Sequence, residues 1–236
     1  MNEKTLMADP GYFDVTLFTF LETLRQNNNR EWFQANKQRY EADVRDPMRR
    51  FIGDFGPHLR TISARFVADP RANGGSLFRI YRDVRFAKDK RPYKTNAGAQ
   101  FRHEAGRDVH APGFYLHLEP GMVFVAAGVW HPDNHTLSKI RDAIVAHPQA
   151  WKRATSSKTF RATGCLGGDS LKRPPHGYDP EHPLIEDLKR KDFVAHAQFT
   201  EAQACAPDFM AVFTETCRAF APMTKFLTAA LHLPWS

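Results

Sequence analysis

The sequence predicts a single α+β domain, with N-terminal and C-terminal helices packed on a central antiparallel sheet that has meander connections. Three observations favour this class. Apolar residues recur at helical spacing in the first and last thirds of the 236 residues, apolar and polar residues alternate in the middle third, and no internal repeat or linker divides the chain. The domain is expected to span residues 1–236, and residues 1–12 are a candidate disordered segment.

The first third is expected to be helical. Apolar residues recur at helical spacing over 13–24 and again over 32–40, and the polar run 26–29 separates the two segments. Asp46-Pro47 is then expected to begin a further helix. Aspartate accepts the free backbone N–H groups at a helix start, and proline at the first helical position loses no hydrogen bond.

The middle third alternates as strands do. Over residues 77–86 every even position is apolar except Arg82, so this arginine is expected to be paired and partly buried, to lie in a bulge, or to follow a strand that ends near Tyr81. Pro120-Gly121 predicts a turn. The predicted strands are 77–86, 98–103, 114–119 and 122–130.

The last hundred residues return to helix. An amphipathic segment covers 137–144, and a long helix is expected from Pro207 through Leu231 with a kink near Pro222. Two further segments, 160–164 and 193–199, are predicted as edge strands.

Positive charge is concentrated in one window of the chain. The formal net charge is +7, and residues 71–107 contain ten Lys or Arg against three Asp or Glu, so this window carries the whole excess. A local field of this kind can bind or steer an anion.

Candidate ligand-binding groups lie on the predicted strand 77–86, on the loop after it, and on a proline-rich loop at 171–183 that could fold over them. Arginine offers a planar fork of donors that matches phosphate or carboxylate, and lysine adds a mobile point charge. In the alternative, Asp83 and Asp89 pair with neighbouring arginines and the rest is a solvated rim. The candidates are Arg79, Tyr81, Arg82, Arg85, Lys88, Lys90, Tyr93, Lys94, Lys172 and Arg173.

Five of the eleven histidines lie within residues 103–135. On the strand 114–119, His117 is expected to share a face with Tyr115 and Glu119, and His103 and His110 could approach it. Neutral histidine can act as a general base, so the catalytic candidates are Asp83, His110 and His117. No zinc-binding spacing is present, and a structural or surface role for each histidine is the alternative.

The remaining composition bears on the cellular compartment. The three cysteines are far apart and form no CxxC pair, which predicts free, buried thiols in a reducing compartment. The sequence shows no signal peptide and no apolar run long enough to cross a bilayer. A cytoplasmic protein without a membrane partner is therefore expected, and neither a cofactor nor an oligomeric state follows from the sequence.

Four segments carry a family resemblance: NNNREWFQANKQRYEADVRDPMRRFI (27–52), GGSLFRIYRDVRFAKDKRPYKTNAGAQFRH (74–103), DVHAPGFYLHLEPG (108–121) and LKRPPHGYDPEHP (171–183). Together they resemble an uncharacterised family of bacterial and fungal proteins, domain-of-unknown-function family 2461. The resemblance spans roughly Phe13 to Phe220 and implies one domain. It implies no activity, ligand or catalytic residue, because none is established for the family.

These observations leave three hypotheses. The first is a protein that binds a phosphate-bearing or other anionic ligand, a small metabolite or nucleic acid, on the surface from Arg79 to Lys94. The second is a phosphate-ester hydrolase, in which Arg79, Arg85 and Lys94 hold the phosphate. His110 or His117 would then transfer protons, and Asp83 would orient a base or hold a cation. The third is an interaction module with a basic face for a protein partner, which predicts an exposed apolar patch beside the charges.

Overall fold

The computed structural model describes residues 11–106 and 111–236, and it confirms the predicted α+β class. In the described residues five strands form one antiparallel sheet in the order β1-β2-β3-β5-β4. The strands are β1 (Ala97–Arg102), β2 (Gly113–Glu119), β3 (Met122–Val129), β4 (Cys165–Gly167) and β5 (Phe193–Phe199). The first three make the predicted meander, and Gly121 turns the chain between β2 and β3 with a φ of 78°.

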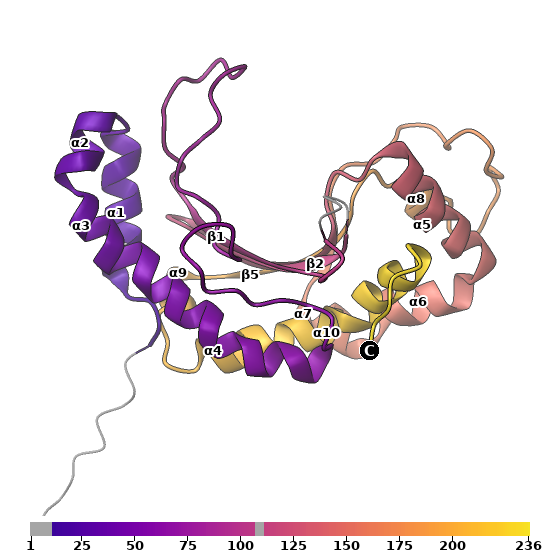
Figure 1. Cartoon of the computed structure of the whole chain (residues 1–236). Helices are drawn as coiled ribbons and strands as arrows, with labels where there is room; N and C mark the ends of the chain where they lie inside the picture. Colours follow the sequence, from indigo (N-terminus) through magenta and orange to yellow (C-terminus); the bar gives the residue numbers. More distant parts are fainter. Residues whose placement is uncertain (1–10, 107–110) are drawn as a thin grey trace, which may run out of the picture.

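One face of the sheet carries the core because the strands alternate. On β2, Phe114, Leu116 and Leu118 are fully buried, whereas Tyr115 and Glu119 on the opposite face are only partly buried. Helices α4 (Asp46–Ile62) and α10 (Phe209–Ala230) cover the buried face. Figure 1 shows both helices beneath the sheet, and no helix of the described residues lies over the other face.

The N-terminal helices follow the predicted pattern with one correction. Asp14 caps α1 (Val15–Gln26) and Asn29 caps α2 (Arg30–Ala35), each by accepting a backbone N–H. Asp46 does not cap a helix, because α3 (Lys37–Tyr40), the π-helical turn η1 (Glu41–Arg45) and α4 follow one another without a break. Of the segment 1–12, residues 1–10 lie outside the described residues, and the Tyr12 ring packs on Phe51 with 5.3 Å between centroids.

The C-terminal part differs from the prediction at two strands. Residues 160–163 are helical, because Ser157 caps α7 (Lys158–Thr163) and Phe160 packs on Phe220 of α10. β5 is an inner strand between β3 and β4 rather than an edge. The remaining helices are α5 (Asn134–Ala146), α6 (Pro148–Ser156), α8 (Ile185–Leu188) and α9 (Glu201–Ala204).

Residues 77–86 do not form the predicted strand. The segment pairs at two separate places: Phe78 N–H donates to Gly98 O of β1 at 2.9 Å, and Arg82 N–H donates at 2.8 Å to Pro92 O, in the segment that precedes β1. The pairing stops there because Pro92 has no N–H to return. The chain then leaves the sheet as an irregular excursion, and we call residues 79–94 the basic loop.

None of the helices in the described part of the chain combines the length and the apolar character that a membrane span needs.

Candidate functional site

A groove of about 780 Å³ lies over the face of the sheet that no helix covers. Its floor is formed by the outward-facing residues of β1, β2, β3 and β5. Phe78, just before the basic loop, and Lys94, its last residue, border the groove on one side, and Trp130 and Gly168 lie at the other end. The volume lies within the range of small-molecule sites in proteins.

Small residues hollow the floor. An added Cβ on Gly98 would come 2.5 Å from the hydroxyl oxygen of Tyr115, so the absence of a side chain lets the Tyr115 ring lie across β1. Gly128 has a φ of 125°, and an added Cβ there would come 2.0 Å from Phe193 O. Ala126 lies between Tyr115 and His196 on the neighbouring strands. The small side chains at these positions therefore leave room in the floor of the groove.

Tyr115, His117 and Glu119 share the open face, as the alternation predicts, and form a hydrogen-bonded chain. The Tyr115 hydroxyl is 3.0 Å from His117 Nδ1, and His117 Nε2 is 3.1 Å from Glu119 Oε2. Thr95 Oγ1 donates to the other oxygen of Glu119 at 2.9 Å. Because an ionised carboxylate only accepts, Nε2 of His117 carries the proton and Nδ1 accepts from Tyr115.

Burial sets the protonation of this chain. His117 is 8% exposed and stacks on Phe124 with 4.6 Å between ring centroids. Desolvation lowers the pKa of His117, although Glu119 acts in the opposite direction. Desolvation, followed by the charge of Glu119, raises the pKa of Tyr115 to about 12. At neutral pH the groove floor therefore presents a neutral imidazole and a protonated phenol.

Two cations line the groove, and no carboxylate lies among its lining residues. Lys94 Nζ sits 5.1 Å from the centre of the Phe78 ring, and burial and then the charge of Arg79 lower the pKa of Lys94. Arg102 Nε donates to the Gln100 side chain at 2.9 Å. The described residues place no carboxylate within ion-pair distance of either cation. Apolar and aromatic lining comes from Phe78, Met122, Phe124, Trp130 and Val194.

The edge of the groove at β5 carries a second imidazole. His196 lines the groove, and its Nε2 is 3.9 Å from the sulfur of Cys165 on the edge strand β4. An added Cβ on Gly167 would meet the His196 ring at 2.7 Å, so this glycine provides the space for it. Cys165 is exposed, which corrects the expectation of three buried thiols; Cys205 is half-buried and Cys217 is buried.

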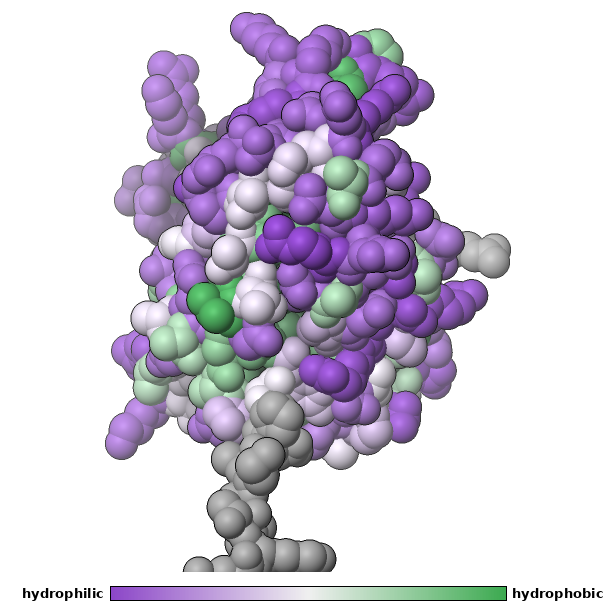
Figure 2. Space-filling view, turned by 90° about the vertical axis from the view of Figure 1, so that its left-hand side faces the viewer, coloured by the Kyte–Doolittle hydropathy of each residue, from purple (hydrophilic) through white to green (hydrophobic). Residues whose placement is uncertain are grey.

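The basic loop neutralises much of its own charge. Arg82 Nη1 is 2.7 Å from Asp89, so the sequence anomaly at Arg82 is a paired, partly buried arginine. Asp83 pairs with Arg85, also at 2.7 Å, and both side chains are more than half exposed. The Lys90 ammonium donates to Val84 O, and Lys88 is exposed. Figure 2 views the side of α1 to α4, whose upper part is almost entirely hydrophilic.

Tyr93 belongs to the core rather than to the surface of the basic loop. It is 2% exposed, and its ring stacks on Phe33 with 4.1 Å between centroids. The Asn28 side chain holds its backbone twice, accepting from Tyr93 N–H and donating to Tyr93 O, each at 3.0 Å. Tyr81 packs on the outer side of Tyr93 and is 52% exposed. Asn28, in the polar run at 26–29, thus anchors the base of the basic loop.

Lys172 and Arg173 lie away from the basic loop. Their segment starts beside α8, where Leu171 N–H donates to Lys189 O, and it docks on α5 through Tyr178, which donates to Asp142 at 2.8 Å. Figure 1 shows this loop, in orange, at the opposite end of the sheet from the basic loop. The proline-rich loop therefore does not fold over the basic loop, and both cations are exposed.

The predicted histidines do not converge. His103 is buried, with Nε2 2.7 Å from Pro234 O and Nδ1 accepting from Ala105 N–H, so it is a structural residue. His110 lies outside the described residues. Of the catalytic candidates, His117 lies in the groove and Asp83 is held by Arg85. No group of three His, Cys, Asp or Glu side chains within 11–106 and 111–236 is arranged to hold a metal ion.

Fold and groove together define a class: an α+β protein whose antiparallel sheet has helices on one face and a cation-bearing groove on the other. The family model described as "Conserved hypothetical protein (DUF2461)" matches residues 16–226, and the chain belongs to this family. Among proteins with curated descriptions, none matches the chain.

Proposed function

We propose that the protein binds a small anionic ligand with an apolar or aromatic portion in the groove over the open face of the sheet. One observation carries the proposal: the groove pairs apolar walls with Lys94 and Arg102, two cations that have no carboxylate partner in the described residues. A phosphate or carboxylate would offset the cost of holding these charges near the apolar lining. Phe78, Phe124 and Trp130 would contact the apolar portion.

The location of the two cations sets the shape of the ligand. Lys94 stands at the start of β1 and Arg102 at its end, so at a rise of ~3.3 Å per residue they lie roughly 25 Å apart along the strand direction. A single phosphate cannot bridge them. We therefore propose an elongated ligand with its anionic group at the Lys94 end, where Tyr115 and His117 lie, or with an anionic group at each end.

A fluorescent probe of the same chemistry tests the proposal. The dye 1-anilinonaphthalene-8-sulfonate is an aromatic anion whose emission rises in apolar surroundings. We expect one saturable site in the native protein, and Lys94→Ala should weaken the affinity by about tenfold, because one charge-assisted hydrogen bond is lost. Arg85→Ala, which removes an exposed and already paired arginine of the basic loop, is the matched control and should leave the affinity unchanged.

The outcome also separates the groove from the basic loop. Equal weakening by Arg85→Ala and Lys94→Ala would move the site to the loop, where the charge window of the sequence places it. Dye binding that rises without saturation would report loosened packing instead, so near-ultraviolet circular dichroism is recorded on every variant.

Nucleic acid is the other anionic partner of this proposal. The exposed cations Arg79, Lys88 and Lys90 of the basic loop would contact phosphates in that case. Affinity would then fall steeply with salt, because each phosphate contact releases counterions. A mobility-shift assay with single-stranded and double-stranded oligonucleotides at low salt tests it, and no shift at any protein concentration would remove this partner.

A hydrolase acting on a phosphate ester is the second candidate, and the Tyr115–His117–Glu119 chain favours it. His117 Nδ1 accepts from the Tyr115 hydroxyl, so a proton from an attacking water would reach the neutral imidazole through Tyr115, while Glu119 holds Nε2. Lys94 would hold the phosphate, whereas Asp83 is engaged by Arg85 and lies outside the groove. This version replaces the loop-centred set of residues with one centred on β2.

Hydrolysis of p-nitrophenyl phosphate provides the test of this second candidate. Turnover that His117→Asn abolishes and Asp83→Asn leaves intact would support it; turnover that survives His117→Asn would assign the activity to another site or to a contaminant. We further propose a cytoplasmic location, which the three free cysteines support because thiols persist in reducing compartments.

A further inference from the structure

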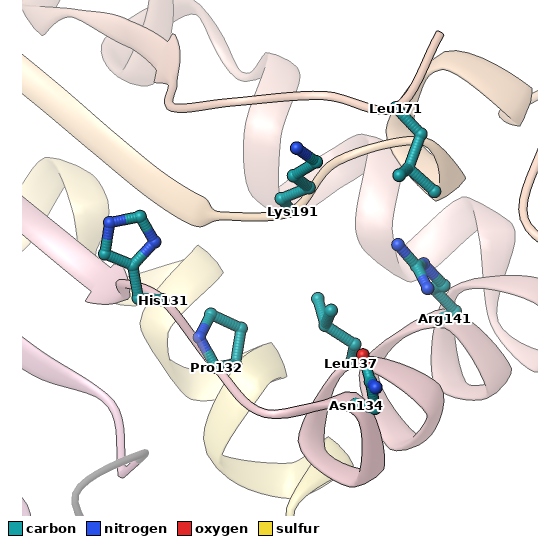
Figure 3. Close-up of a pocket in the computed structure, with 7 residues that line it drawn as sticks. All are labelled: His131, Pro132, Asn134, Leu137, Arg141, Leu171 and Lys191. Atoms are coloured by element: carbon teal, nitrogen blue, oxygen red, sulfur yellow. The ribbon is translucent and has the colours of Figure 1, made fainter. Parts of the chain in front are cut away.

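A second, smaller pocket of about 310 Å³ lies where α5 begins, beside the segment that enters β5. It is lined by His131, Pro132, Asn134, Leu137, Arg141, Leu171 and Lys191. In Figure 3 His131 and Arg141 lie at opposite ends of the pocket, with Lys191 and Leu171 above and Leu137 and Asn134 below. None of these residues lines the groove on the sheet, so the two cavities are separate.

Arg141 is the residue of this pocket that an anionic ligand would stabilise most. Its side chain is buried, with 8% of the residue exposed, and no carboxylate of the described residues lies within ion-pair distance of it. Nε donates to Leu188 O at 2.7 Å and Nη2 donates to Arg190 O at 2.9 Å. These carbonyl groups fix the guanidinium but carry no net charge. A guanidinium has five N–H donors, so donors remain for a ligand.

The other polar groups of the pocket add positive character. Lys191 is exposed, and no carboxylate of the described residues lies within ion-pair distance of it. Its backbone is fixed by a hydrogen bond from its N–H to Asp169 O. Asp192, the carboxylate next to it, is buried and already accepts the N–H groups of His131 and Asp169. His131 Nδ1 lies 3.3 Å from Asp192, which orients the ring at the pocket's edge. An anion in the pocket would meet two cations and no carboxylate of the lining.

We propose that this pocket binds the phosphate group of a small molecule, or inorganic phosphate itself, between Arg141 and Lys191. Arg141 supplies the planar donors that match two phosphate oxygens, and Lys191 reaches a third. His131 closes the far end of the pocket. The volume leaves room beside the phosphate for a small organic group only.

Inorganic phosphate is the probe, added at constant ionic strength to the native full-length protein. Its binding is followed through the imidazole resonances of His131, assigned with the His131→Gln variant. We expect a saturable shift of His131 and no shift of His117 or His196, which line the other cavity. A phosphate monoester titrated in the same way distinguishes an organic phosphate, which should bind more tightly, from the free ion. A failure of the groove proposal would leave this result unchanged.

Lys191→Ala is the decisive variant, because Lys191 is exposed and its loss should not unfold the protein. It should weaken phosphate binding by about tenfold, the effect of one charge-assisted hydrogen bond. Lys189→Ala is the matched control, because Lys189 pairs with Glu186 outside the pocket. This variant should bind phosphate with the affinity of the native protein. Absence of a saturable His131 shift, or equal affinities of the two variants, would overturn the proposal.

Discussion

The basic loop and the groove present the same kind of charge in opposite settings. The loop holds most of the cations of the window 71–107, but Asp83 and Asp89 pair with three of its arginines and the ion pairs are largely exposed. The groove holds two cations, which have no carboxylate partner in the described residues, and one of them, Lys94, stands beside the Phe78 ring. Exposed ion pairs contribute little energy, whereas charges near apolar surface interact strongly with an arriving anion.

The difference teaches that charge density along a sequence is a poor guide to an anion site. What matters is which charges stay unpaired and which lie in a concave, partly apolar setting. Lys94 joins both regions, since it ends the basic loop and lines the groove. Of the ten residues that the sequence nominates for ligand binding, it is the one that the groove contains.

The largest expected effect is a loss of stability, and it distinguishes a buried candidate residue, Tyr93, from a half-exposed one, Tyr81. Tyr93→Ala should lower the free energy of unfolding by about 3 kcal/mol or more, because a buried ring stacked on Phe33 is lost. Tyr81→Ala, at the half-exposed neighbour, should cost about 1 kcal/mol. Urea denaturation measures both. Equal costs would mean that Tyr93 is not the residue that anchors the basic loop.

The next effect concerns the groove floor. Gly98→Ala should destabilise the protein by roughly 1–3 kcal/mol, because the new methyl group overlaps the Tyr115 hydroxyl and displaces the ring. Gly53→Ala in α4 is the control: an added Cβ would meet Pro70 at an ordinary contact distance of 3.9 Å, and alanine favours a helix, so it should stabilise by about 0.5–1 kcal/mol. The imidazole resonances of His117 should shift in Gly98→Ala alone. An unchanged His117 spectrum would contradict the close contact of Gly98 with the Tyr115–His117 pair.

A smaller effect follows from the pKa of His117. Burial lowers this pKa, so the unfolded chain, with an ordinary value of 6.5, takes up a proton more readily than the folded protein. The contribution of the neutral ring to stability is therefore present above pH 6.5 and is lost as pH falls through 6.5 toward the lowered pKa. In urea titrations, the difference in free energy of unfolding between the native protein and His117→Asn should become smaller as the pH is lowered from about 7.5 to about 5. A gap that is independent of pH would argue against a buried neutral imidazole.

The smallest effect belongs to the basic loop. Arg85→Ala should leave the free energy of unfolding nearly unchanged, because its ion pair with Asp83 is exposed and spans only two residues. Thermal unfolding at low and high salt checks this. A clear, salt-dependent loss of stability would show that the pairs of the basic loop hold the excursion together.

Much of the fold follows from local pattern. Alternation predicts β1, β2, β3 and β5, and it also predicts that Tyr115, His117 and Glu119 share one face. The strand expected at 77–86 fails because its partner segment contains Pro92, and alternation in one segment carries no information about the other. The expected edge strand at 160–164 fails because the Ser157 cap and burial of Phe160 against Phe220 favour a helix.

The groove could not be predicted because it depends on pairings between distant residues. Register places His196 across Ala126 from Tyr115. Gly98 provides space for the Tyr115 ring because Tyr115 pairs with Gln100, the next residue along β1 on the same face as Gly98. Asn28 meets Tyr93 across 65 residues of sequence. The local pairs Asp83–Arg85 and Asp89–Arg91 are, by contrast, two residues apart, and the alternative of a self-paired rim was visible in the sequence.

The most direct test of the groove is to watch both regions while one anionic aromatic probe binds. Protein labelled at histidine and phenylalanine is titrated with 1-anilinonaphthalene-8-sulfonate, and the resonances of His117, His196 and Phe86 are followed. Phe86 is 96% exposed on the basic loop, whereas both histidines line the groove. Saturable shifts of His117 and His196 with Phe86 unchanged are the predicted result. Shifts of Phe86 with both histidines unchanged would contradict a ligand site on the open face of the sheet.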